Sequence, residues 1–177
     1  MRRQIPSRIR CGPLTVYVTS FDGTADLPSL LESLPPPHPV MWLDSARAHA
    51  VTGRWSMLAY EPWLVLSACG PRIELRTSRA THVFRAHPLD ALTQVLQRYQ
   101  IPAAARARLG AAGRAIGLTG FLSYELNRWI ERLPPPRPSG PSVPDMLWFS
   151  MQRIVLVDHL QQRSWLLSVA DPHRPKP

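Results

Sequence analysis

The chain has 177 residues, of which 45% are hydrophobic, and a formal net charge of +9. This length predicts one domain with a buried core, and the fourteen aromatic residues (six Trp, four Tyr and four Phe) argue against a disordered protein. The two cysteines form no CxxC pair, and no Cys/His cluster has metal-ligand spacing, so neither a disulfide framework nor a zinc site is expected. A reduced, cytoplasmic setting fits this composition best.

The positive charge is not arranged as nucleic-acid binding requires. Lys176 is the only lysine, and the arginines are scattered among apolar residues without a block of like charges. We therefore expect solvated arginines and no nucleic-acid partner. No apolar run reaches the roughly 18 residues of a membrane span, so no membrane partner is expected either.

The first half of the chain predicts mostly short strands. Residues 1–13 are basic and are expected to be a disordered N-terminus, and a strand with alternating residues follows at 14–21. Asp26 is expected to cap a short helix that ends at Leu34, before the PPPHP run. Gly and Pro then separate five expected strands, at 40–43, 55–60, 64–68, 72–76 and 81–85.

In the middle of the chain, the spacing of the apolar residues changes from that of strands to that of a helix. An apolar stripe predicts a helix over 88–99, whereas the Gly-bounded run 103–113 is interpreted as a loop with one helical turn. A strand is expected at 115–124. It contains Gly117 and Gly120, and glycines in a strand are typical of a bulge or of a second backbone lying close.

The last third predicts one more helix and a hairpin. An amphipathic helix is expected at 124–133, followed by a stiff Pro-rich connector. A long hairpin should occupy 146–159 and 164–169, and residues 170–177 should form a Pro-rich tail without structure. Together these elements predict an α+β fold, a mostly antiparallel sheet or sandwich with two or three packed helices.

The search for catalytic chemistry finds no motif. Ser45, Ser56 and Ser123 lack a GxSxG elbow, the acidic residues are dispersed, and there is no phosphate loop or metal-binding pattern. The stretch 42–62 is the best site candidate. It contains two apolar runs whose polar ends should lie side by side over apolar walls, an arrangement usual in small-molecule sites.

Three stretches, in matching order and spacing, resemble one family. The family is component I of the chorismate-utilising synthases, anthranilate synthase and aminodeoxychorismate synthase. The stretches are WLDSARAHAVTGRWSMLAYEP (42–62), GLTGFLSYELNRWIERLP (117–134) and VPDMLWFSMQRIVLVDH (143–159). The first resembles the family's N-terminal signature, the second its glycine-rich strand and following helix, and the third its later hairpin strand with an Asp-His end.

This resemblance implies that residues 14–169 form the family's N-terminal domain. In the family, a C-terminal chorismate-binding domain holds Mg²⁺ and carries the chemistry, and this chain ends before that domain. We therefore expect a truncated product, one half of a split protein or an excised domain, with no catalytic residues and no cofactor of its own. The implied partners are a chorismate-binding domain, in cis or in trans, and a glutamine amidotransferase subunit for the full enzyme.

The resemblance also names a candidate ligand site. Ser45 matches the family's serine and is a candidate to bind a ligand amino group, with Asp44 beside it. Arg54, Trp55 and Ser56 match the adjacent wall of a tryptophan-type pocket, which the missing domain would complete. The alternatives are that Ser45 caps a turn and that Trp55 belongs to the core.

The choice between the two family branches depends on two departures from the family pattern. Trp42 and Asp44 stand where feedback-regulated anthranilate synthases typically have Leu and Glu. This favours a non-catalytic domain of an aminodeoxychorismate synthase component I-like protein, in para-aminobenzoate and folate biosynthesis. Anthranilate synthase component I, in tryptophan biosynthesis, is the alternative enzyme, and a stand-alone ligand- or protein-binding module is the alternative of another class.

Overall fold

The computed structural model describes residues 6–35, 39–45, 49, 52–133 and 143–170. The predicted connector and the tail beyond residue 170 lie outside these residues. The elements in chain order are β1 (Ser7–Cys11), β2 (Leu14–Asp22), α1 (Leu27–Ser33), β3 (Val40–Leu43), β4 (Trp55–Cys69), β5 (Arg72–Thr77), β6 (Thr81–Arg85), α2 (Pro88–Arg98), α3 (Ala103–Leu109), the 3-10 helix η1 (Gly110–Ala115), β7 (Thr119–Leu122), the 3-10 helix η2 (Tyr124–Trp129), β8 (Met146–Asp158) and β9 (Arg163–Ala170).

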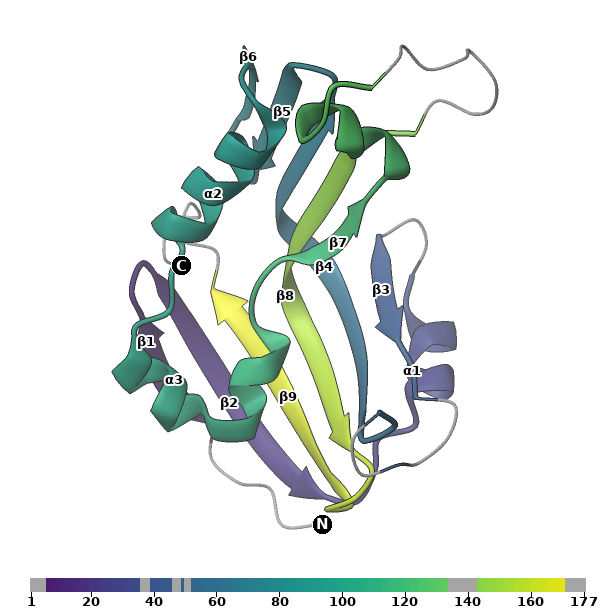
Figure 1. Cartoon of the computed structure of the whole chain (residues 1–177). Coiled ribbons are helices and arrows are strands. Elements are labelled where there is room, and N and C mark those ends of the chain that lie inside the picture. Colours follow the sequence, from purple (N-terminus) through teal and green to yellow (C-terminus); the bar gives the residue numbers. More distant parts are fainter. Residues whose placement is uncertain (1–5, 36–38, 46–48, 50–51, 134–142, 171–177) are drawn as a thin grey trace.

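The described strands form one antiparallel sheet. Its order is β1-β2-β9-β8-β4-β5-β6, with β3 added beside β4 and β7 added beside β8. The two long strands β4 and β8 pair along their whole length, so they run through the sheet from end to end (Figure 1). The predicted α+β class, with a mostly antiparallel sheet and packed helices, is confirmed.

Strand β4 replaces two expected strands. The sequence predicts separate strands at 55–60 and 64–68, but the chain continues through Pro62, and its register against β8 shifts between Pro62 and Leu64. Proline has no N–H to donate to the ladder, and Glu61 takes a φ of 59° beside it. The resulting bulge turns Trp63 into the core, where only 2% of its surface is exposed.

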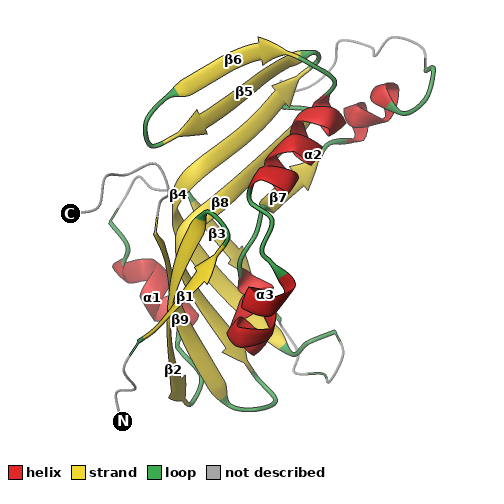
Figure 2. Cartoon of the chain, turned by 90° about the vertical axis from the view of Figure 1, so that its left-hand side faces the viewer, coloured by secondary structure: helices red, strands yellow, loops and turns green. Residues whose placement is uncertain are grey.

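Helices cover both faces of the sheet. Figure 2 shows α1 on one face and α2 and α3 on the other. Successive side chains of a strand point to opposite faces of the sheet. Leu58 accordingly packs toward α1, whereas its neighbours Met57 and Ala59 belong to the larger core under α2 and α3. None of the helices in the described part of the chain has the length and apolar character of a membrane span.

The helix predicted after Asp26 is confirmed. The Asp26 carboxylate accepts hydrogen bonds from Ser29 N at 3.2 Å and from Ser29 Oγ at 2.6 Å, as an N-cap residue does. These bonds from Ser29 lower the pKa of the Asp26 carboxyl. Pro28 occupies the first turn, where its missing N–H breaks no hydrogen bond.

Two segments expected to lack regular structure are ordered. Residues 7–11 form β1 rather than part of a disordered N-terminus, because Ile9 and Cys11 are buried while Arg8 and Arg10 face solvent, a strand period. Residues 103–109 form α3 rather than a loop. Alanine has the highest helix propensity, and the helix ends where Gly110 takes a φ of 55°.

The segment 115–133 differs most from the prediction. Only residues 119–122 form a strand, and the expected amphipathic helix at 124–133 is a 3-10 helix of six residues. Leu126 is buried as expected, but Ile130 is 69% exposed and Leu133 is 41% exposed, so the predicted stripe does not face the core. The close backbone approach expected at a glycine is confirmed at Gly120, whose Cβ would overlap the carbonyl oxygen of Leu147.

Candidate functional site

The two polar ends of the stretch 42–62 meet, as the sequence predicts. Leu43 of β3 pairs with Met57 of β4, which places the residues after β3 opposite the start of β4. Ser45 N donates to Ser56 Oγ at 3.0 Å, and Ser45 Oγ donates to the carbonyl oxygen of Trp55 at 2.6 Å. Ser45 is thus held by two hydrogen bonds to β4.

Ser56 is the centre of this arrangement. Its side chain is buried, with 1% of the residue exposed, and its hydroxyl lies 2.9 Å from Asp44 Oδ1 and 2.7 Å from His159 Nε2. A hydroxyl has one proton, and an ionised carboxylate can only accept, so Ser56 donates to Asp44. His159 Nε2 must then carry its proton and donate to Ser56.

This order of contacts does not make a nucleophilic triad. In such a triad the carboxylate orients the histidine, which in turn takes the proton of the serine. Here the serine lies between Asp44 and His159, and its lone pairs accept from Ser45 N and His159 Nε2. The residues Asp44, Ser45, Ser56 and His159, which we call the serine network, therefore hold the two strand ends together rather than activate a nucleophile.

Arg54 bonds to Asp158 rather than to the serine network. Its Nε and Nη2 donate to both oxygens of Asp158, at 3.0 Å and 2.6 Å, in a bidentate pair. The Asp158 side chain is fully buried, and that of Arg54 is 30% exposed. The hydrogen bond from Arg54 lowers the pKa of Asp158 and raises that of Arg54, and the N–H groups of Gln161 and Leu160 lower the pKa of Asp158 further.

Trp55 is packed by the protein on several sides. Its ring lies 6.1 Å from that of Trp165, and the guanidinium carbons of Arg54 and Arg114 lie 4.7 Å and 5.4 Å from its centroid. Both arginines are within cation–π range. Trp55 is half-buried against the core, which favours its structural interpretation.

Three residues of this region were not among the predicted site residues: Arg114, Asp158 and His159. Asp158 is the last residue of β8 and His159 follows it, about one hundred residues after the start of β4. The end of β8 pairs with the start of β4, where Asp158 lies opposite Trp55. The only signal for them was the Asp-His end of the third matching stretch. Arg114, in η1, had no sequence signal.

The serine network retains polar capacity at its outer edge. Asp44 is exposed, and its Oδ2 has no hydrogen-bond donor among the residues that the structure describes. Beside it, Ser45 Oγ uses its proton on Trp55 but keeps lone pairs. These groups can accept hydrogen bonds from an ammonium group. Within the described ranges, no group of three or more His, Cys, Asp or Glu side chains is arranged to hold a metal ion.

Comparisons with known proteins identify relatives. No protein-family model matches the sequence. The chain is 30% identical over 131 residues to anthranilate synthase component 1 from Synechocystis, and 28% identical over 132 residues to aminodeoxychorismate synthase component 1 from Klebsiella aerogenes. These matches cover 73% and 75% of this chain but only 25% and 29% of the relatives.

A solved structure shares the fold. Anthranilate synthase component I from Streptococcus pneumoniae matches with a TM-score of 0.55 and 18% identity, over 86% of this chain and 31% of its own. The chain thus spans between a quarter and a third of the length of these proteins. It is homologous to part of component I of anthranilate synthase and of aminodeoxychorismate synthase.

Proposed function

We propose that this chain is a non-catalytic, N-terminal-type domain of an aminodeoxychorismate synthase component I-like protein. The observation that carries the proposal is the unequal coverage: about three quarters of this chain matches only 25% to 29% of the relatives' length. The serine of the described network that most resembles a catalytic group, Ser56, is buried and lies between two partners. The domain would support synthesis of a folate precursor only together with a chorismate-binding domain.

The proposed role of the serine network is to form one wall of an amino-acid pocket of the tryptophan type. Asp44 and Ser45 would receive the ligand's ammonium group, and Ser56 would hold both in position. Arg54 would act indirectly, because its guanidinium is committed to Asp158. The remaining wall would come from the chorismate-binding domain, so a low affinity is expected for the isolated chain.

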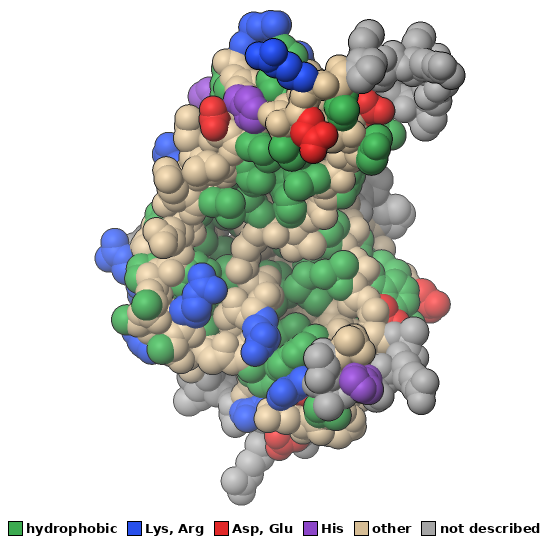
Figure 3. Space-filling view, viewed as in Figure 1, with side chains coloured by type: hydrophobic (Ala, Val, Ile, Leu, Met, Phe, Trp, Pro, Cys, Tyr) green, Lys and Arg blue, Asp and Glu red, His purple; other side chains and the backbone are tan. Residues whose placement is uncertain are grey.

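An exposed apolar surface supports a docking partner. Tyr124 is 85% exposed and Ile130 69%, and Phe121 and Leu122 on the adjacent β7 are 40% and 49% exposed. Figure 3 shows hydrophobic side chains gathered on the face that carries α2 and β7. Contiguous apolar patches on a protein surface commonly mark interfaces. We propose that the chorismate-binding domain, in cis or in trans, covers this surface.

Anthranilate synthase component I remains the second candidate. The relative with 30% identity and the matching solved structure both have this name. The 28% identity to the aminodeoxychorismate relative is nearly the same, so Trp42 and Asp44 are the residues that favour the folate branch.

The first test is catalytic inactivity. Purified chain incubated with chorismate, Mg²⁺ and ammonium should form neither aminodeoxychorismate nor anthranilate, because the proposed domain has no chorismate site. Product analysis by liquid chromatography measures this directly, with a full-length component I as the positive control. Turnover of either product above the background without protein would exclude a non-catalytic domain.

The second test concerns the amino-acid pocket. Isothermal titration of the chain with tryptophan should give weak saturable binding, and Ser45→Ala should weaken it about tenfold, since a hydrogen bond to a charged group contributes about 1.5 kcal/mol. Ser33→Ala, an exposed serine on α1, is the matched control and should leave the dissociation constant unchanged. Equal affinities for the parent chain and Ser45→Ala would remove Ser45 from the pocket.

A further inference from the structure

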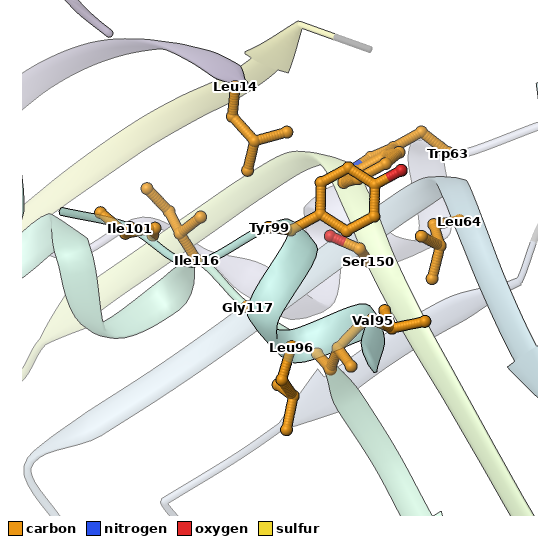
Figure 4. Close-up of a pocket in the computed structure, with 11 residues that line it drawn as sticks. Leu14, Trp63, Leu64, Val95, Leu96, Tyr99, Ile101, Ile116, Gly117 and Ser150 are labelled. Atoms are coloured by element: carbon orange, nitrogen blue, oxygen red, sulfur yellow. The ribbon is translucent and has the colours of Figure 1, made fainter. Parts of the chain in front are cut away.

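A cavity lies between α2, the segments on either side of α3 and η1, and the sheet. It has a volume of about 50 Å³ and is lined mostly by apolar side chains. Figure 4 shows Leu14, Val95 and Ile116 around the ring of Tyr99. The ring of Trp63 closes one side and meets Tyr99 edge-on, with 5.0 Å between the centroids. This edge-to-face pair gives the cavity an aromatic wall.

Besides the two aromatic residues Trp63 and Tyr99, whose rings carry one polar atom each, one polar side chain lines this cavity. Ser150, on β8, is only 7% exposed, yet its hydroxyl has no hydrogen-bond partner among the residues that the structure describes. A hydroxyl that lines a cavity can bond to water or to a ligand there. Ser150 therefore offers a donor and an acceptor to whatever enters the cavity.

A wider groove of about 340 Å³ adjoins the cavity. Leu96, Tyr99 and Ile116 line both spaces, so the two lie side by side. The outer part is polar: Gln97, Gln100 and Arg106 line it, and Arg106 has no ion pair with any described residue. The hollow is visible between α2 and α3 in Figure 3. Cavity and groove together have the size usual for small-molecule sites.

We propose that the cavity and groove form one binding site for a small aromatic hydroxy acid. The hydroxyl of the ligand bonds to Ser150, its ring packs against Trp63 and Tyr99, and its carboxylate lies in the groove near Arg106. Each end of the site thus matches one group of the ligand. The Ser150 hydroxyl lies at the buried end, and the guanidinium of Arg106 and the amides of Gln97 and Gln100 line the open end. The site shares no residue with the serine network, so it is independent of the proposed amino-acid pocket.

The test uses 4-hydroxyphenylacetate and two analogues, each lacking one group. Phenylacetate lacks the hydroxyl, and 2-(4-hydroxyphenyl)ethanol lacks the carboxylate. Isothermal titration should show saturable binding of 4-hydroxyphenylacetate. Ser150→Ala should weaken its binding about tenfold while leaving phenylacetate within about twofold, and Arg106→Gln should weaken both acids about tenfold but not the neutral alcohol.

A third variant locates the binding. Leu96 is 52% exposed and lines both spaces, so Leu96→Trp should fold normally and block the groove, abolishing saturable binding. Ser150→Ala removes an unpartnered hydroxyl without a change of volume, so it should not lower the melting temperature. The proposal is overturned if 4-hydroxyphenylacetate does not saturate the parent chain, or if its affinity is the same in all three variants.

Discussion

Gly120→Ala is expected to destabilise the chain by about 3 kcal/mol or more, the largest effect of any single methyl group considered. Gly120 of β7 pairs with Trp148 of β8, and a Cβ at this position would overlap the carbonyl oxygen of Leu147 and lie 2.8 Å from the Cα of Trp148. These are backbone atoms of a central strand, which cannot move aside as a flexible side chain can. The added methyl should therefore detach β7 from β8, and equilibrium unfolding in urea measures the loss.

Gly113→Ala is the matched control. Its Cβ would meet a side-chain atom, Leu109 Cβ, at 3.2 Å, and the glycine lies in η1 outside the sheet. The expected change in the free energy of unfolding is within about 1 kcal/mol. Alanine stabilises the fold by lowering the entropy of the unfolded chain, and the small adjustment of Leu109 offsets part of this stabilisation. Equal stability of Gly120→Ala and the parent chain would show that β7 does not depend on this close approach.

The sequence predicted best what local rules determine. The cap at Asp26, the helix after Pro88 and the close approach at Gly120 each depend on a few consecutive residues. The juxtaposition of Ser45 and Ser56 was also predictable, because consecutive antiparallel strands that pair place their adjoining ends together. In each case the preference of a residue type for a backbone geometry agrees with the tertiary structure.

The errors arose where two local rules competed. At 103–109 the bounding Gly suggested a loop, but the high helix propensity of alanine favours α3. At 124–133 the apolar spacing was correctly recognised, yet an apolar stripe does not say whether it faces the core or a partner. Leu126 reaches the core, while Ile130 stays exposed at the surface that we propose for docking.

The partners of the site could not be predicted because they are remote in the chain. Arg54 and Asp158 are separated by 104 positions, and Ser56 and His159 by 103. Their contacts result from the pairing of β4 with β8, a register that involves twelve residue pairs and the bulge at Trp63. Such a register is a property of the whole sheet, not of either strand alone.

Asp158→Asn is expected to lower the free energy of unfolding by roughly 2 kcal/mol near neutral pH, because it removes the charge-assisted hydrogen bonds between Arg54 and the buried Asp158 carboxylate. The amide oxygen can still accept from Leu160 N and Gln161 N, which bond to Asp158 Oδ1 at 3.0 Å and 3.1 Å, so the turn between β8 and β9 should persist. The substitution thus isolates the ion pair. Glu74→Gln, in the exposed pair with Arg72, is the control and should change stability by less than about 1 kcal/mol.

The pH dependence of this loss distinguishes the ion pair from simple packing. The folded pKa of Asp158 is lowered from its ordinary value of 3.8, so the unfolded chain binds the proton first as the pH falls. The contribution of Asp158 is therefore complete above the ordinary pKa and disappears as the pH falls through the lowered folded pKa. The difference between the parent chain and Asp158→Asn, measured by urea unfolding at decreasing pH, should shrink over that range. A difference that stays constant down to about pH 3 would mean that the carboxylate acts through its shape and turn hydrogen bonds rather than through its charge.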